Sequence, residues 1–198
     1  MWTQRYDRPD YLFGTEPAAF LTAQARHLPA GADVLCVADG EGRNSTWLAA
    51  QGHRVTAFDP APTALAKARQ LAEARGVSVA LHEAGVEDWD WAPAARDAVV
   101  AIFIQFAPPD LRDRLFAWMA RTLRPGGVLL LHGYAPRQVG YGTGGPPAAE
   151  NMYTPEMLHA AFPGWHVLRA ADYDADIAEG SGHAGRSALV DFVAVKPD

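Results

Sequence analysis

The segment around Gly40 and Gly42 is the part of the sequence best suited to bind a ligand through its backbone. An apolar run ends there in Asp39-Gly40-Glu41-Gly42, and a helix pattern starts at Arg43. Glycine has no Cβ, so the backbone can approach a ligand closely, and the free N–H groups of a helix start favour an anionic or carbonyl group. These residues predict a small-ligand site, although a plain tight strand–helix turn has the same pattern.

Asp59 is the second candidate, because it closes the next predicted strand 19 residues after Gly40. A carboxylate at that position can accept hydrogen bonds from both hydroxyls of a ribose. The alternative is a helix-capping aspartate, since Pro60 follows and a helix pattern begins shortly afterwards. Together with the two glycines, the spacing favours a nucleoside ligand. Ser45 stands where a dinucleotide fingerprint needs its third glycine, and no P-loop motif occurs.

A third motif, Leu123-Arg124-Pro125-Gly126-Gly127-Val128, lies between a helix pattern and a strand pattern. With this motif the chain resembles the class I S-adenosylmethionine-dependent methyltransferases. Its first motif is similar to the Gly-Asn-Gly-Arg-Asn-Ser form of small methyltransferases of the tellurite-resistance and thiopurine type. The resemblance covers residues 2 to about 131. It implies S-adenosylmethionine as the cofactor and methyl transfer to a small molecule as the reaction.

The resemblance also implies a role for each cofactor-binding position. The methionine part would lie against Gly40 and Gly42, the ribose against Asp59, the adenine between Phe58 and Pro60 with Val86 and Glu87 at its edge, and the reacting end beside Ile104, Gln105 and Phe106. An N-terminal arm that contains Trp2, Tyr6 and Gly14 would close over the cofactor. Asp39 and Asn44 complete the predicted cofactor site.

The acceptor side is predicted from residues 133–147, of which 8 of 15 are glycine or proline. Loops of this kind commonly close over a reacting centre, so we interpret residues 133–153 as a lid, with a surface insertion as the alternative. Tyr141 is the first candidate for a side chain that faces the acceptor, and Tyr134 is the second. His183, in a loop predicted over residues 179–187, could orient the acceptor or take its proton, unless it lies in an exposed turn.

The predicted chemistry depends on the acceptor atom. A thiolate or chalcogen anion needs little help from a base, whereas an oxygen or nitrogen acceptor would need one, and the candidates are His183, Tyr141 and Glu150. No recognisable metal-ligand spacing occurs, so no metal site is predicted. Phe103, inside a predicted strand, is expected in the core. Two other functions stay open: a nicotinamide-dependent oxidoreductase, and a non-catalytic protein that binds S-adenosylmethionine.

The elements that must position these residues are predicted from the hydrophobic periodicity. Strands are expected at residues 33–38, 54–58, 77–81, 98–106, 128–131, 165–173 and 188–195, and helices at residues 17–27, 43–51, 62–75, 111–122 and 155–162. Strands that alternate with helices indicate a parallel sheet covered on both faces. With the resemblance, this predicts an α/β fold: a Rossmann-like, seven-stranded, mostly parallel sheet with helices on both faces and its last strand antiparallel. Residues 1–198 are expected to be a single domain in which residues 1–27 form an N-terminal arm and helix.

The composition narrows the choice of partners. The 198 residues carry a net charge of −6 and only 17 scattered basic residues, which argues against binding to nucleic acid. A single cysteine, Cys36, excludes a disulfide framework within the chain. No apolar run reaches the roughly 20 residues of a membrane span, and the N-terminal residues do not read as a signal peptide. We therefore expect a cytoplasmic monomer or homodimer, with a small-molecule acceptor and no membrane partner.

Overall fold

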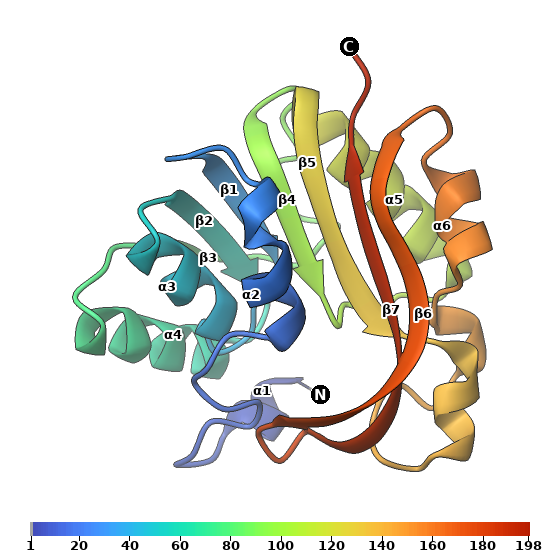
Figure 1. Cartoon of the computed structure of the whole chain (residues 1–198). Helices are drawn as coiled ribbons and strands as arrows, with labels where there is room; N and C mark the ends of the chain where they lie inside the picture. The colour runs from blue at the N-terminus through green and yellow to red at the C-terminus, as the bar shows by residue number, and fades with distance from the viewer. Residues whose placement is uncertain (1) are drawn as a thin grey trace.

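The computed structural model describes residues 2–198 and contains one seven-stranded sheet with the order β3-β2-β1-β4-β5-β7-β6 (Figure 1). The strands are β1 (Asp33–Val37), β2 (Arg54–Asp59), β3 (Ala80–Glu83), β4 (Arg96–Ile102), β5 (Leu123–Tyr134), β6 (His166–Glu179) and β7 (His183–Val195). The first five pair in parallel, whereas β7 runs antiparallel to both β5 and β6. The predicted fold class, with its last strand antiparallel, is confirmed.

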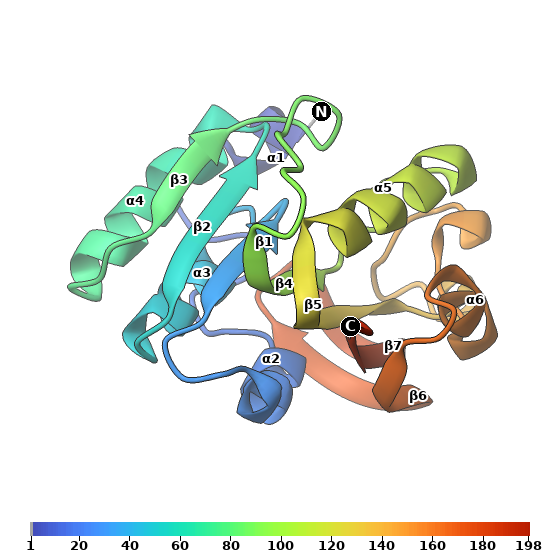
Figure 2. The same ribbon diagram turned by 90° about the horizontal axis from the view of Figure 1, so that it is seen from above.

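Helices cover both faces of the sheet. They are α1 (Trp2–Tyr6), α2 (Ala19–Gln24), α3 (Arg43–Ala50), α4 (Pro62–Ala74), α5 (Pro109–Thr122) and α6 (Pro155–Ala161), with short 3₁₀ turns η1 (Ala25–His27), η2 (Pro136–Gly140) and η3 (Ala149–Asn151). Figure 2 shows α2, α3 and α4 on one face of the sheet and α5 and α6 on the other. Alternate residues of the central strands therefore point into two separate cores: Val34 and Cys36 face α2 and α3, whereas Leu35 and Val37 face α5.

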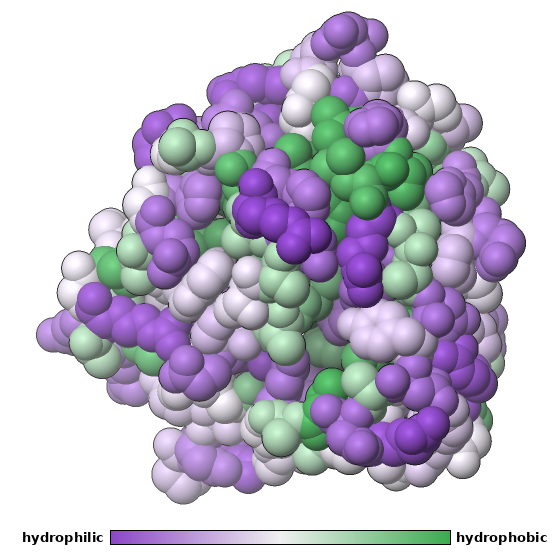
Figure 3. All heavy atoms as spheres, in the orientation of Figure 1, coloured by the Kyte–Doolittle hydropathy of each residue, from purple (hydrophilic) through white to green (hydrophobic). Residues whose placement is uncertain are grey.

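The face with α2, α3 and α4 is mostly polar in the space-filling view (Figure 3). The largest group of apolar side chains on this face lies near the upper ends of β5, β7 and β6, which no helix covers on this side. Among residues 2–198, no helix is both long and apolar enough to cross a membrane. The expected oligomeric state, a monomer or homodimer, stays a prediction.

Three strands before the last hairpin differ from the prediction. β3 begins at Ala80 and not at Val77. β5 continues through Pro125-Gly126-Gly127, where we expected the preceding helix to end, because Gly126 takes a left-handed φ of +72° and bonds to the carbonyl of Lys196. β4 ends at Ile102 and not at Phe106, because Phe103 leaves the strand with a φ of +57°. Few non-glycine residues adopt such a φ, and the hydrophobic pattern of residues 98–106 gives no sign of it.

The last two strands are longer than predicted and form one continuous hairpin. The predicted loop over residues 179–187 is mostly strand: β6 ends at Glu179, β7 begins at His183, and only residues 180–182 make the turn. The hairpin tip reaches the N-terminal segment (Figure 1), where the N–H of Gly182 donates to the carbonyl of Leu12 at 2.9 Å. A Cβ on Gly180 would lie 2.4 Å from the backbone of this segment, so only glycine permits the approach.

The segment expected to be an unstructured lid is partly regular. Gly133 and Tyr134 are the last residues of β5, and Pro136–Gly140 forms η2. The side chain of Gln138 is fully buried: its Oε1 accepts from the N–H of Ala188 at 2.7 Å, and its Nε2 donates to Thr143 and to the carbonyl of Gly144. Residues 133–135 and Gln138 are thus buried, whereas most of residues 139–147 are exposed, and Tyr134 and residues 145–147 border the cavity described next. The interpretation of the segment as a lid stays a prediction.

Candidate active site

A cavity of about 560 Å³ opens at the carboxyl ends of β1, β2, β4 and β5. This is the edge at which open parallel sheets bind their ligands. Thirteen of the predicted site residues line it: Trp2, Tyr6, Asp39, Gly40, Asn44, Asp59, Pro60, Val86, Glu87, Gln105, Phe106, Tyr134 and His183. The structure therefore brings most of the predicted cofactor and acceptor positions into one space.

Five predicted site residues lie elsewhere. Gly14 borders a separate cavity of about 340 Å³, Phe58 is buried with its ring stacked on Trp89, and Ile104 lies in the core beside α5. Gly42 packs against α4, where an added Cβ would lie 2.7 Å from that of Ala68. None of these four residues lines the cavity, so their contact with the cofactor stays a prediction.

Tyr141, our first candidate for the acceptor side, is the fifth. Its hydroxyl donates to Asp174 at 2.7 Å in an exposed network with Arg137 and Arg186, on the outside of the β6–β7 hairpin. Since η2 turns the chain away after β5, Tyr141 faces this network while Tyr134 stays at the cavity. Tyr134 is therefore the better placed of the two for an acceptor in this cavity, and the acceptor-facing role of either tyrosine stays a prediction.

Asp59 lies at the part of the cavity wall that was expected to bind the ribose, and it also forms a hydrogen bond with the glycine loop. Its Oδ2 accepts from the N–H of Gly40 at 3.0 Å and its Oδ1 from the N–H of Ala61 at 2.9 Å. Burial raises the pKa of this carboxyl, and the two backbone hydrogen bonds oppose the shift. No side chain caps the start of α4, so Asp59 holds two loops in place and presents a carboxylate at the cavity wall.

Asp39 and Gly40 shape the adjoining part of the cavity. Burial raises the pKa of Asp39 to about 7, and Ser45 donates to its Oδ2 at 2.5 Å. Ser45, which stands in place of the third glycine of a dinucleotide fingerprint, is thus the hydrogen-bond donor of Asp39. Gly40 has a φ of +63°, which favours glycine, and a Cβ there would lie 2.8 Å from the hydroxyl oxygen of Tyr6, so a larger residue would displace this side chain of the arm.

The aromatic end of the cavity holds His183. Its ring is stacked between Phe13 and Phe103, with centroid distances of 4.3 and 4.1 Å, and its Nδ1 shares a hydrogen bond of 2.6 Å with the hydroxyl of Tyr134. Burial, and then the positive charge of Arg43, lower the pKa of His183 to about 3, so the imidazole is neutral at pH 7. Burial also raises the pKa of Tyr134, whose phenol stays protonated.

Gln105 fixes the position of Tyr134. Its Nε2 donates to the carbonyl of Tyr134 at 2.7 Å, and its Oε1 accepts from the N–H of the same residue at 2.6 Å. The amide occupies the space that a Cβ on Gly133 would need, 2.6 Å away. This pair of hydrogen bonds explains why a buried glutamine follows β4 and why glycine precedes Tyr134.

Sequence reasoning missed one contributor to this end of the cavity. Phe103 was assigned to the core, yet it lines the cavity and stacks on His183. Only its left-handed backbone turns the ring toward the site, and the strand-like sequence around it carries no signal of that conformation. Phe13 lies in the N-terminal arm, which was expected to cover the site. Its stacking partner, His183, could not be predicted, because the length of the β6–β7 hairpin places this histidine beside the arm.

The residues present fit S-adenosylmethionine, which supplies an electrophilic methyl group on a sulfonium when bound. The cavity combines a buried carboxylate for a ribose, a glycine loop at a helix start, and apolar Pro60 and Val86 at the predicted adenine position. A volume of about 560 Å³ lies within the usual range for such ligands. No group of three or more His, Cys, Asp or Glu side chains within residues 2–198 could hold a metal ion.

Comparisons with known proteins agree with this geometry. Residues 34–127 match the model of a methyltransferase-domain family, a stretch that contains the glycine loop and Asp59. A search of curated proteins found no significant match. Among solved structures, the chain is similar to a protein from work on the conversion of a disulfide bond into a thioacetal group during echinomycin biosynthesis, with a TM-score of 0.76 and 20% identity over 96% of this chain and 85% of that chain.

Two further structures share the fold. TehB from Haemophilus influenzae has a TM-score of 0.71 and 16% identity, over 89% of this chain and 61% of that chain. An S-adenosylmethionine-dependent methyltransferase from Methanosarcina mazei has a TM-score of 0.70 and 16% identity, over 87% of this chain and 96% of that chain. At these identities the likeness concerns the fold alone. The match over residues 34–127, slightly less than half of the chain, supports a methyltransferase domain, and the fold and the cavity are compatible with S-adenosylmethionine as its cofactor.

Proposed function

We propose that the enzyme methylates a small molecule at a thiol or chalcogen anion, bound at the end of the cavity where His183 and Tyr134 lie. The observation that carries this proposal is the state of His183. A general base works best when its pKa lies near the operating pH, whereas the pKa of this imidazole is lowered to about 3. A thiolate is a strong nucleophile that needs no base at the moment of transfer.

The walls of this end suit such an acceptor. They include the rings of Phe13 and Phe103, which stack on His183, and the ring of Tyr134, which bonds to it. The acceptor sulfur would form a bond to the methyl carbon while the bond from that carbon to the cofactor sulfur breaks, and the electron pair stays on the cofactor sulfur. In such a displacement the protein mainly aligns the reacting atoms and excludes water. His183, held by Tyr134 and two aromatic rings, would orient the acceptor.

We also propose that the protein is related to the tellurite-resistance and thiopurine-type methyltransferases. The fold likeness to TehB is compatible with it, and one structure similar to this chain comes from work on a disulfide and a thioacetal, which is chemistry at sulfur. Neither likeness exceeds 20% identity, so the state of His183 and the aromatic walls carry the argument.

A panel of matched acceptors tests the proposal. Small thiols, and alcohols and amines of the same carbon skeleton, are incubated with S-adenosylmethionine, and release of S-adenosylhomocysteine is followed from pH 6 to 9. We expect methylation of thiols, with a rate that rises with pH according to the pKa of each thiol. For a good thiol, His183→Asn should raise KM more than it lowers kcat.

Two outcomes would contradict a sulfur acceptor. One is a faster reaction with an alcohol or amine than with the matched thiol. The other is a pH profile that stays the same from one acceptor to the next and disappears in His183→Asn, because it would reveal an enzyme base in place of the acceptor's own ionisation.

A further inference from the structure

We propose that Glu41, the residue between the two glycines of the cofactor loop, is a positioning residue that holds the N-terminal arm closed and, through Phe13, holds His183 in place. The N-terminal arm denotes residues 2–16 here. The part of the proposal that concerns His183 rests on the proposed function. The attachment of the arm does not, because it is a property of the folded chain.

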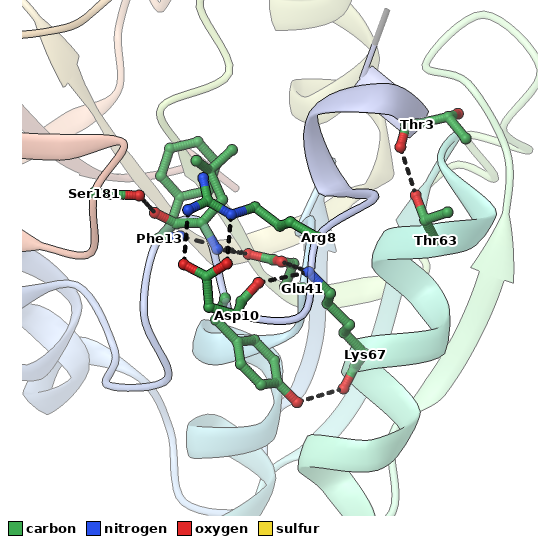
Figure 4. Close-up of polar contacts among 10 residues, drawn as sticks. Thr3, Arg8, Asp10, Phe13, Glu41, Thr63, Lys67 and Ser181 are labelled. Carbon is green, nitrogen blue, oxygen red and sulfur yellow. Dashed lines mark hydrogen bonds and ion pairs between the residues drawn. The ribbon is translucent and has the colours of Figure 1, made fainter.

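Glu41 accepts hydrogen bonds from the arm's backbone. Its Oε2 lies 2.8 Å from the N of Leu12 and 3.4 Å from the N of Phe13, and its Oε1 pairs with Nζ of Lys67 on α4 at 2.8 Å (Figure 4). Only 2% of the Glu41 side chain and 12% of the Lys67 side chain are exposed. A carboxylate is a strong acceptor for backbone N–H groups, and at this burial it needs the nearby ammonium to compensate its charge.

Lys67 attaches the arm at further points. Its Nζ also donates to the carbonyl of Asp10 at 2.7 Å, and its own carbonyl accepts from the hydroxyl of Tyr11 at 3.1 Å. Together with Glu41, it binds four consecutive arm residues, 10–13, to the cofactor loop and α4. The ion pair between Arg8 and Asp10 differs, because it is exposed and lies wholly within the arm (Figure 4).

The attached residues are the ones that reach the aromatic end of the cavity. The ring of Phe13 covers one face of His183, and the carbonyl of Leu12 accepts from the N–H of Gly182 next to it. If residues 12 and 13 left their position, His183 would lose one stacking partner and gain water. Glu41 therefore connects the loop that faces the cofactor with the side chain that faces the acceptor, although it does not itself line the cavity.

Hydrogen exchange measures the attachment directly. Glu41→Gln replaces a charged acceptor by a neutral one and leaves Lys67 without its carboxylate, so amide exchange in residues 2–16 should become about tenfold faster or more. Lys67→Gln keeps the two hydrogen bonds to Glu41 but removes the compensating ammonium and its bond to the carbonyl of Asp10, so it should also speed exchange in the arm. Asp10→Asn is the matched control, since it removes only the exposed ion pair within the arm and should leave exchange near the wild-type rate.

The NMR titration of His183 tests whether Glu41 positions this side chain. If Glu41 only stabilised the fold, its replacement would not change the pKa of His183. In Glu41→Gln, hydration of the ring should raise its pKa toward the usual range, whereas Asp10→Asn should leave it unchanged. Exchange in β1 and circular dichroism confirm that each variant is folded. If Glu41→Gln does not fold, Lys67→Gln is judged by the same two measurements.

Two results would overturn the proposal. In the first, arm exchange in the folded Glu41→Gln variant is the same as in Asp10→Asn. In the second, the arm opens and the titration of His183 stays as in the wild type. Neither measurement needs a methyl acceptor, so a failure to methylate thiols would contradict the proposed function and leave this test intact.

Discussion

Replacing Gly42 by alanine is expected to destabilise the fold without removing a contact to the cofactor. Gly42 precedes α3 with a left-handed φ of +84°, and an added Cβ would lie 2.7 Å from the Cβ and 2.9 Å from the Cα of Ala68. Backbone and a helical side chain cannot yield as the end of a flexible side chain would. The variant therefore tests whether this glycine serves the packing of α3 on α4 or the ligand.

The expected loss can be worked out from two contributions. A left-handed conformation costs an alanine roughly 1–2 kcal/mol. Overpacking against Ala68 costs roughly 1–3 kcal/mol more. The free energy of unfolding should thus fall by about 2–5 kcal/mol, which in a chain of this size corresponds to a decrease in Tm of roughly 4–20 °C.

Gly52→Ala is the matched control. Gly52 has a similar φ of +88°, but an added Cβ would meet nothing within 4 Å. This variant should lose only the roughly 1–2 kcal/mol of the left-handed conformation. The additional loss in Gly42→Ala should be partly restored by Ala68→Gly in the double variant, after allowing about 1 kcal/mol for glycine in a helix.

Urea unfolding and calorimetric titration with S-adenosylhomocysteine give the two readouts. The reasoning is refuted if Gly42→Ala and Gly52→Ala lose the same stability. It is also refuted if Gly42→Ala keeps its stability but no longer binds S-adenosylhomocysteine, because Gly42 would then line the methionine part of the site as the sequence suggested.

Three other expectations concern single side chains. Asp59→Ala should weaken S-adenosylhomocysteine binding about tenfold or more in titration calorimetry, since a charge-assisted hydrogen bond is lost; unchanged affinity in the folded variant would remove the ribose role. The pKa of Asp39 is raised to about 7 from 3.8, so its folded form keeps the proton longer and wild-type stability falls as pH rises from about 4 to 7. In urea unfolding, the free energy of unfolding of Asp39→Asn minus that of the wild type should therefore be larger at pH 8 than at pH 4.5. The same difference at both pH values would contradict this. Tyr141→Phe should keep kcat within about twofold, because its hydroxyl bonds only to the exposed Asp174; a larger loss in steady-state kinetics would return Tyr141 to the site.

The sequence was sufficient to bring the glycine loop and Asp59 together, because both are encoded locally. Gly40 follows β1 and Asp59 ends β2, and consecutive strands joined by a helix usually lie side by side in parallel. The register of β1 and β2 then places both residues at the same edge, where Asp59 accepts from the N–H of Gly40. Fold class followed for the same reason, since each strand and helix carries its own hydrophobic period.

Only the tertiary structure decided the acceptor half. Phe13, Phe103, Tyr134 and His183 come from four distant segments, and they meet because Phe103 leaves its strand with a left-handed backbone and because the β6–β7 hairpin extends to residue 183. Strand length and register depend on pairing across the sheet, which the hydrophobic pattern of one strand does not contain. Tyr134 and Tyr141 looked alike in the sequence; pairing of Tyr134 with Leu189 kept the first at the cavity, while η2 carried the second to Asp174.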